Sequence, residues 1–310
     1  MLSSLQSEKK RRELNEKLIK YTLILAAAIS ILTTFGILFS ILFEAIEFFQ
    51  LRSFWYFLTG TIWSPGVANS QFGALPIFAG TFVITIIALL VAIPIGLGSA
   101  IYMSEYASPK FRDYLKPILE ILAGIPTVVY GFFAAITVAP LVVKVAAFFG
   151  LEATFNSALA SGIVMGIMII PLISSLSDDV IRAVPDSQRK AAFALGMTHG
   201  ETIKNIVIPS AMPGIISASL LALSSALGET MIVVMAAGLR PNLSWNPLED
   251  MTTVTVTIVN SLVGDFEFNS PETLSAFALG LVLFIVTLIL NMISLSLIRK
   301  FKEKYKVNTL

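Results

Sequence analysis

The chain has 310 residues, of which 56% are hydrophobic and only 13% are charged, whereas soluble domains carry about 25% charged residues. This deficit points to lipid as the solvent of much of the chain, and the net charge of +1 gives no indication of nucleic acid binding. Because cysteine is absent and His199 is the single histidine, disulfides, thiolate metal sites, a cysteine nucleophile and a histidine-rich zinc site are excluded.

The first 20 residues are polar and basic, and an apolar run from about Tyr21 to Phe43 follows them. A signal peptide has an apolar core of about 7–15 residues that ends at a small-residue cleavage site. The run here is longer, and no such site closes it. We therefore expect residues 1–20 to form a cytoplasmic segment, and residues 21–72 to form a retained first transmembrane helix with an external loop.

Six segments are long and apolar enough to cross a membrane, because a bilayer core about 30 Å thick requires about 20 helical residues. Pro94, Pro126 and Pro140 lie inside the second and third of them, where proline removes a backbone donor and kinks a helix. These two long spans are expected to tilt or bend. The predicted spans of this all-α membrane protein are residues 22–43, 75–103, 117–148, 156–176, 210–238 and 273–298.

The lysines and arginines are distributed unevenly between the predicted loops. Eighteen of the 21 fall in four segments, namely residues 1–20, 104–116, 177–209 and those after 298. Basic residues are enriched in cytoplasmic loops. The distribution therefore predicts that both termini are cytoplasmic, which agrees with an even number of spans.

Two features fall outside this simple pattern. Residues 251–263 are rich in threonine and valine but too short to span, so they form either an interfacial or re-entrant segment or part of a folded external loop. Gly162 and Gly166 form a G-x-x-x-G pair in the fourth span. That spacing allows two membrane helices to approach closely, so it is a candidate helix contact.

No catalytic or cofactor-binding pattern is present. The chain has no G-x-x-x-x-G-K-[ST] loop, so we do not expect it to hydrolyse ATP. The acidic pairs at 178–179 and 249–250 fall in predicted polar loops, where carboxylates are usually solvated. His199 is predicted to lie on the surface, and no metal-ligating or nucleophilic set remains.

The loop before the fifth span has a recognisable order. It predicts a short amphipathic helix, a turn at Gly196, and a second helical stretch that ends at Pro209. Such a loop between two membrane helices could transmit force from a soluble partner, and an ordinary connection is the alternative. The residues of interest are Arg189, Lys190, Ala191, Ala192, Leu195, Gly196 and Met197.

This loop resembles the coupling motif of bacterial ABC-importer permeases, in which E-A-A is followed by three residues, Gly, nine residues and I-x-L-P. The spacing from Lys190 to Pro209 matches in full, but Lys190 replaces the usual Glu and Ile208 replaces the usual Leu. Four further stretches are similar to permeases of the Pst phosphate transport family, and Trp63-x-Pro65 is most similar to the C-type subunit. These stretches are residues 72–81, 92–107, 119–132 and 226–231.

The resemblance implies a type I ABC-importer permease fold, with a transport domain at 73–298, a coupling loop at 177–209 and a cytoplasmic tail at 299–310. It implies import of inorganic phosphate across a prokaryotic plasma (inner) membrane by alternating access. The implied partners are an A-type permease, two ATPase subunits that hold ATP and Mg²⁺, and an external phosphate-binding protein. The chain itself would bind no cofactor, and its surroundings would be membrane lipid.

Glu229 lies inside the apolar fifth span, where a charge costs roughly 2.5–3.5 kcal/mol on insertion scales. It is either a substrate-pathway residue or a residue satisfied by a helix–helix contact. Pst permeases commonly carry an arginine one turn earlier, but this stretch has Ser224 and Ser225 instead. We hypothesise that the partner permease supplies the cation for the anion, while Ser224, Ser225 and Thr230 supply hydroxyl donors.

Three other functional classes are alternatives to a phosphate-importing ABC permease. A permease for another oxyanion, such as molybdate or sulfate, would carry the same coupling loop. An ATP-independent secondary transporter or channel would be favoured by inverted repeats or by several intramembrane acids, and neither is seen. An intramembrane enzyme would need a nucleophile–base or metal set, which one histidine and no cysteine almost exclude.

Overall fold

The computed structural model describes residues 2–66, 70–263 and 269–304. Parts of the predicted external loops (67–69 and 264–268) and of the predicted tail (305–310) lie outside the described residues. Six helical stretches in the described ranges are long and apolar enough to cross a membrane, which is the predicted number. They are Asn15–Leu51, Leu75–Tyr106, Thr127–Phe148, Ala158–Arg182, His199–Leu227 and Pro271–Lys300.

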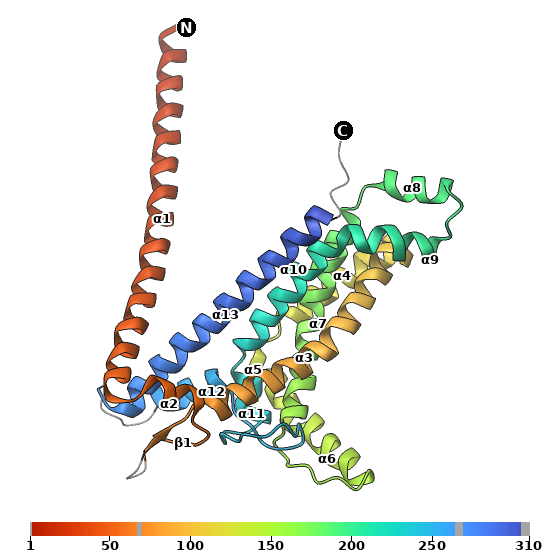
Figure 1. Ribbon diagram of the computed structural model, residues 1–310. Coiled ribbons are helices and arrows are strands. Elements are labelled where there is room, and N and C mark those ends of the chain that lie inside the picture. Colours follow the sequence, from red (N-terminus) through yellow and green to blue (C-terminus); the bar gives the residue numbers. More distant parts are fainter. Residues whose placement is uncertain (1, 67–69, 264–268, 305–310) are drawn as a thin grey trace.

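The first helix, α1 (Leu2–Leu51), runs without a break from the basic segment through the first span. It stands apart from the other helices at its beginning and joins them near its end, where a short helix, α2 (Phe54–Thr59), follows (Figure 1). At this junction the buried Phe48 ring makes edge contacts with the rings of Phe57 and Phe72. This aromatic cluster fixes the far end of α1 to the bundle.

A two-stranded antiparallel hairpin lies beside α2 and was not predicted. Strands β1 (Trp63–Ser64) and β2 (Gln71–Phe72) pair Trp63 with Phe72. Both aromatic side chains are buried, so the hairpin forms because it closes the aromatic cluster at the end of α1.

The centre of the bundle is the pair α3 (Leu75–Ile101) and α7 (Ala158–Arg182). A Cβ atom added to Gly162 would lie 2.7 Å from the Ile87 side chain, and one added to Gly166 would lie 2.8 Å from the Ala88 carbonyl oxygen. Only hydrogen fits at these two positions. The G-x-x-x-G prediction of a close helix contact is therefore confirmed.

The predicted third span, residues 117–148, is wrong at its start. A separate helix, α4 (Pro109–Ala123), follows a π-helical segment, η1 (Tyr102–Tyr106), and ends at Gly124. The membrane stretch begins only at Thr127, because Pro126 has an extended ψ of 137° and breaks the helix. It consists of α5 (Thr127–Phe133), η2 (Ala134–Val138) and α6 (Ala139–Phe148).

The predicted fifth span, residues 210–238, is also divided differently. The helical run consists of α9 (His199–Thr202), η3 (Ile203–Val207) and α10 (Ile208–Leu227), then breaks before α11 (Met231–Ala236). The expectation that Pro209 ends a helical stretch is wrong. Pro209 lies in the first turn of α10, where proline is tolerated, and the preceding π-helical turn accommodates it.

The threonine- and valine-rich stretch forms α12 (Val254–Leu262), which packs against α3 and the last helix, α13 (Pro271–Lys304). The backbone N–H of Val254 donates to Thr81 Oγ1 of α3 at 3.0 Å, and Gly80 approaches the Thr252 carbonyl. This stretch is thus a folded part of the bundle end. The connection α8 (Asp186–Ala194) lies at the opposite end, together with the beginning of α1 and the end of α13 (Figure 1).

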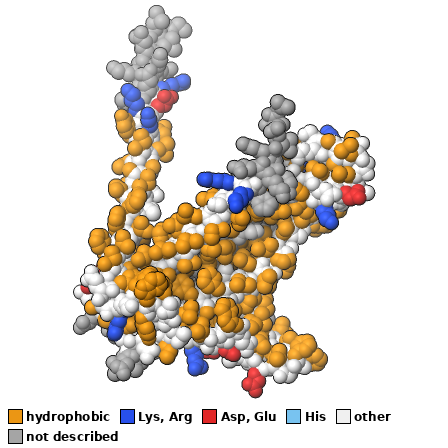
Figure 2. Space-filling model, in the orientation of Figure 1, with side chains coloured by type: hydrophobic (Ala, Val, Ile, Leu, Met, Phe, Trp, Pro, Cys, Tyr) orange, Lys and Arg blue, Asp and Glu red, His pale blue; other side chains and the backbone are white. Residues whose placement is uncertain are grey.

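Hydrophobic side chains cover the long helices on the face that Figure 2 shows, while charged side chains gather near the helix ends. Leu23 and Leu32 of α1 and Leu90 of α3 are among the exposed apolar residues. Such an apolar surface requires lipid or a second membrane protein around it.

Candidate functional site

The first candidate site is the α8 connection, residues 183–198, together with α9. Pro185 precedes α8, and Gly196 turns the chain after it with a φ of +83°, a conformation that favours glycine. Thr198 then begins α9 through a capping box, in which its hydroxyl accepts from the Glu201 N–H and the Glu201 carboxylate accepts from the Thr198 N–H. The predicted order of helix, glycine turn and helix is present.

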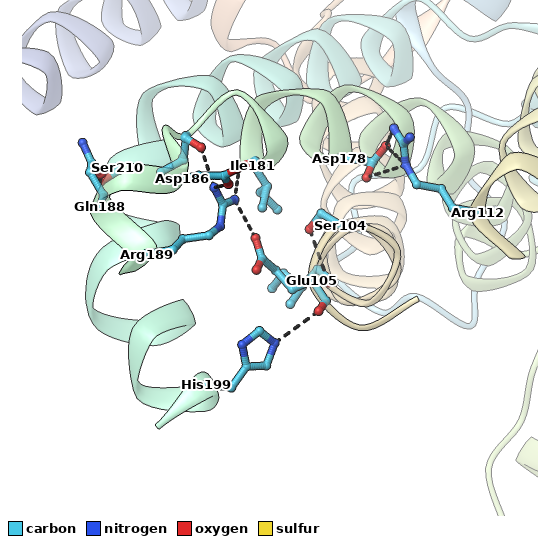
Figure 3. A network of polar contacts seen from close by, with 12 residues as sticks. Ser104, Glu105, Arg112, Asp178, Ile181, Asp186, Gln188, Arg189, His199 and Ser210 are labelled. Atoms are coloured by element: carbon cyan, nitrogen blue, oxygen red, sulfur yellow. Dashed lines mark hydrogen bonds and ion pairs between the residues drawn. The ribbon is translucent and has the colours of Figure 1, made fainter. Parts of the chain in front are cut away.

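Arg189 points from α8 into the molecule rather than toward solvent, and only 16% of its side chain is exposed. Its Nη2 donates to the Glu105 carboxylate at 2.8 Å and to the Ile181 carbonyl at 3.0 Å. Its Nη1 donates to the carbonyl of Val184. Arg189 therefore binds α8 to the end of α7 and to η1 (Figure 3).

The Glu105 side chain is 5% exposed, and the residue receives a second contact from the same connection. Its backbone carbonyl lies 3.1 Å from Nε2 of His199, the first residue of α9. The His199 ring also meets the Tyr106 ring edge-on at 5.1 Å and stacks on Phe193 at 6.2 Å. The expectation of a mere surface position for His199 is incomplete, because this exposed residue joins α9 to η1.

The remaining predicted residues of the connection divide between two faces of α8. Ala192 is buried against the bundle, and Met197 is half-buried. Lys190, Ala191 and Leu195 are exposed, and Leu195 is 81% exposed. The α8 connection therefore presents the Lys190 cation and the large apolar side chain of Leu195 outward, with Phe193 also exposed.

The acidic pair at 178–179 lies on α7, not in a polar loop, so the expectation of solvated carboxylates is wrong for Asp178. That residue is 1% exposed and accepts from Arg112 Nε at 3.1 Å and from Nη2 at 2.6 Å. The hydrogen bond with Asp178 raises the pKa of Arg112 above its ordinary value. Lys116 pairs with the more exposed Asp179 at 2.6 Å. These two pairs fix α4 to α7.

The second candidate site is the break between α10 and α11. Glu229 is buried, with 9% of its surface exposed, and its Oε1 accepts from the Ile232 N–H at 3.2 Å. Its carbonyl accepts from Thr255 Oγ1 of α12 at 2.7 Å. Within the described residues it has no ion pair. The carboxylate thus stabilises the first turn of α11, much as a helix cap does, whereas it is the backbone carbonyl of Glu229 that contacts α12.

The other predicted pathway residues do not gather around Glu229. Ser224 lines a groove of about 740 Å³ between α7, α10 and α13, and its Oγ lies 3.5 Å from Asn291 Oδ1. Of the described residues that line the groove, Asp179 is the one that carries a charge. Ser225 is exposed outside this lining, and Thr230 donates to the Gly228 carbonyl at 3.4 Å. The groove and the break are therefore two places.

The second acidic pair is also more ordered than expected. Glu249 accepts from Asn242 Nδ2 at 2.9 Å and from Asn246 Nδ2 at 3.1 Å. Hydrogen bonds, first from Ser244 and then from Asn242 and Asn246, lower the pKa of Glu249. Its carbonyl accepts from the Ala158 N–H at the start of α7. This loop therefore caps α7 at the end opposite α8.

Sequence reasoning missed Glu105, Arg112 and Asp178 as organising residues. Arg112 and Asp178 are 66 positions apart, and Glu105 and Arg189 are 84 apart. The one feature of the sequence that could have indicated their role is that these charged residues lie next to, or within, apolar spans. No group of three or more metal-ligating residues is found in the part of the chain that the structure describes.

Three comparisons with known proteins bear on the fold. Residues 92–306 match the family of binding-protein-dependent transport system inner membrane components. The chain is 35% identical to a probable ABC transporter permease protein, YqgH, of Bacillus subtilis (81% of this chain, 78% of the relative). It is 34% identical to a phosphate transport system permease protein, PstC, of Mesorhizobium japonicum (86% and 84%), and 30% identical to PstC of Haemophilus influenzae (93% and 94%).

Solved structures agree with this fold. A bacterial alginate ABC transporter in complex with an alginate-bound periplasmic protein aligns with a TM-score of 0.61 at 14% identity, over 91% of this chain and 94% of that one. An inward-facing MetNI methionine ABC transporter aligns with a TM-score of 0.52 at 16% identity, over 74% and 94%. At such identities the likeness concerns the fold alone, which is that of the type I ABC-importer permeases.

Proposed function

The chain belongs to the family of binding-protein-dependent transport system inner membrane components, and we propose that it is a permease subunit that imports inorganic phosphate. The similarity to PstC proteins supports this substrate, since it is 30–34% and extends over most of both chains. The membrane is the inner membrane of a prokaryote, with the α8 end in the cytoplasm. The distribution of lysine and arginine supports that orientation.

In this proposal the α8 connection is the surface that a separate ATPase subunit grips. Lys190, Ala191, Leu195 and Gly196 supply the outer contact, while Arg189 and Ala192 hold α8 against the bundle. The inward direction of Arg189 supports that division of roles. ATP and Mg²⁺ bind to the two ATPase subunits, and their closure and release alternate the access of the pathway.

A second, A-type permease subunit covers the groove between α7, α10 and α13. Among the described residues, the groove lining offers the hydroxyl of Ser224 but no cation, and phosphate is anionic at neutral pH. We therefore expect the partner subunit to supply the positive charge. Ser225 and Thr230 remain candidate donors, and Glu229 acts by holding the break beside the pathway. An external phosphate-binding protein delivers the substrate at the end that carries α12.

Uptake into proteoliposomes tests the proposal. The chain is reconstituted with the permease, ATPase and binding protein encoded beside it. Uptake of labelled phosphate is measured with ATP, without ATP, and with excess molybdate or sulfate, and uptake of labelled molybdate and of labelled sulfate is measured in parallel. ATP-dependent phosphate uptake that excess molybdate or sulfate leaves unchanged is expected. Uptake of molybdate or sulfate alone would refute the substrate, and uptake that does not depend on ATP would refute the coupling.

A further inference from the structure

Both halves of the α8 connection are attached to the same residue of a third helix. Arg189 of α8 reaches the Glu105 carboxylate at 2.8 Å, and His199 of α9 reaches the Glu105 carbonyl at 3.1 Å. The connection is already joined to α7 and α10 by the chain itself. Glu105 adds an attachment to the second span, α3 with η1, which is far from the connection in the sequence (Figure 3).

Local structure explains why Glu105 can serve both partners. It lies in η1, the π-helical last turn of the second span, and the chain becomes extended at Ala107. The last carbonyls of a helix lack partners within that helix, so the Glu105 carbonyl is available to the His199 ring. This contact requires a proton on Nε2, because a carbonyl can only accept. π-Helical turns occur frequently at functional sites.

The attachment is well shielded. The Glu105 and Arg189 side chains are 5% and 16% exposed, and Arg189 is further oriented by the carbonyls of Ile181 and Val184. Charge-assisted hydrogen bonds of this kind are roughly twice as strong as neutral ones. The neighbouring pair of Lys116 and Asp179 is more open, and this ion pair joins α4 to α7 rather than to the connection.

We propose that Glu105 is a positioning residue that fastens the α8 connection to the second span, so that α3 moves together with α8 as one body. A displacement applied to α8 then reaches three spans: α7 and α10 through the chain, and α3 through Glu105. This inference rests on the proposed function for the source of the displacement, whereas the attachment itself does not depend on the substrate.

The first test measures coupling rather than activity alone. In the reconstituted complex, Glu105→Gln removes the charge but keeps the shape of the side chain. Phosphate imported per ATP hydrolysed is expected to fall about tenfold, within the usual range of coupling between sites. Lys116→Gln is the matched control, because it removes an ion pair at the same end of the molecule, and it should leave the ratio unchanged. A purely structural role would lower the amount of complex, and with it uptake and hydrolysis together, without changing the ratio.

Two further variants assign the effect to these contacts. Arg189→Gln should lower the ratio as well, and the double variant with Glu105→Gln should be no worse than the more impaired single variant, because the two residues act through one another. His199→Phe keeps an aromatic ring but removes both ring nitrogens, and with them the contact to the Glu105 carbonyl, so an intermediate loss is expected. Fully additive losses, or an unchanged ratio in Glu105→Gln, would overturn the inference.

A distance measurement separates this inference from the substrate assignment. The chain contains no cysteine, so spin labels can be placed at the exposed Tyr102 of η1 and the exposed Ser187 of α8 after their replacement by cysteine. The distance should stay constant between the nucleotide-free and ATP-bound complexes and should vary in Glu105→Gln. A change in the wild type greater than one helical turn, about 5.4 Å, would refute movement as one body. Failure of phosphate uptake with a constant distance would refute only the proposed substrate.

Discussion

The turn at Gly196 is the most direct structural requirement of the α8 connection. Its φ of +83° lies in the left-handed region, and a Cβ atom added there would meet nothing within 4 Å. Alanine at this position therefore costs backbone strain alone, about 1–2 kcal/mol for an L-residue. This strain would lower the population of the native turn, relative to relaxed alternatives, by a factor of about 5 to 30.

Gly200 provides the matched control, because a Cβ atom added there also meets nothing within 4 Å while its backbone is helical. We expect Gly196→Ala to lower ATP-coupled uptake by up to the same factor and to increase hydrogen exchange in residues 183–198. Gly200→Ala should do neither. Gly196→Asn should be intermediate, because asparagine tolerates the left-handed region better than alanine. Equal behaviour of the two alanine variants would show that the positive φ is not required.

Three other predictions concern the scaffold. Arg112→Met leaves a buried carboxylate without its partner and should destabilise the protein by about 3–5 kcal/mol in thermal unfolding, whereas Lys116→Met, at a more exposed pair, should cost about 0–1 kcal/mol. Gly166→Ala forces α3 and α7 apart and should lower the free energy of unfolding by about 1–3 kcal/mol. Gly36→Ala, with open space around it, should not destabilise the protein. Equal melting temperatures of the two variants would contradict the close packing of α3 and α7. The lowered pKa of Glu249 means that its stabilising hydrogen bonds are present above its ordinary pKa and are lost as pH falls through the lowered value. Exchange in residues 239–250 should therefore rise only below about pH 4.3, and a rise between pH 7 and 5 would contradict this.

Apolar length and glycine spacing were sufficient to predict the large features of the fold. The number of spans and the presence of a close helix contact at Gly162 and Gly166 follow from properties of single segments, which is why they are visible in the sequence, whereas the partner helix α3 was not predicted. The positions where spans end were predicted less well. Pro126 interrupts the helix before the third membrane stretch, whereas Pro209 lies in the first turn of α10 and does not interrupt it. The local sequence does not distinguish these two outcomes.

The order of local elements in the candidate site could be predicted from the sequence, but the ion pairs and hydrogen bonds that join them could not. The order of α8, Gly196 and α9 follows from local turn chemistry, so it could be expected. The direction of Arg189 could not, because it depends on a carboxylate 84 positions away that only the packing of α3 brings near. Likewise Asp178 looked like a solvated loop acid until the helix α7 was seen to extend past it to Arg182.

The arrangement of interactions along the molecule implies where a displacement of α8 must be absorbed. At the α8 end, ion pairs fix α4 to α7 and α8 to η1, and glycine contacts hold α3 against α7 farther along. From His199 to Leu227 the chain is continuously helical, about 44 Å long at 1.5 Å per residue. Helical continuity ends at residues 228–230, where one carboxylate and one threonine hydroxyl replace a helical ladder. A stiff helix transmits a displacement of its first residues, at α9, to its last residues, at the end of α10. Bending should therefore cost least at the break that follows, residues 228–230. Hydrogen exchange at residues 228–230 should therefore respond to ATP more strongly than exchange within α10, and a uniform response along α10 would contradict a rigid rod.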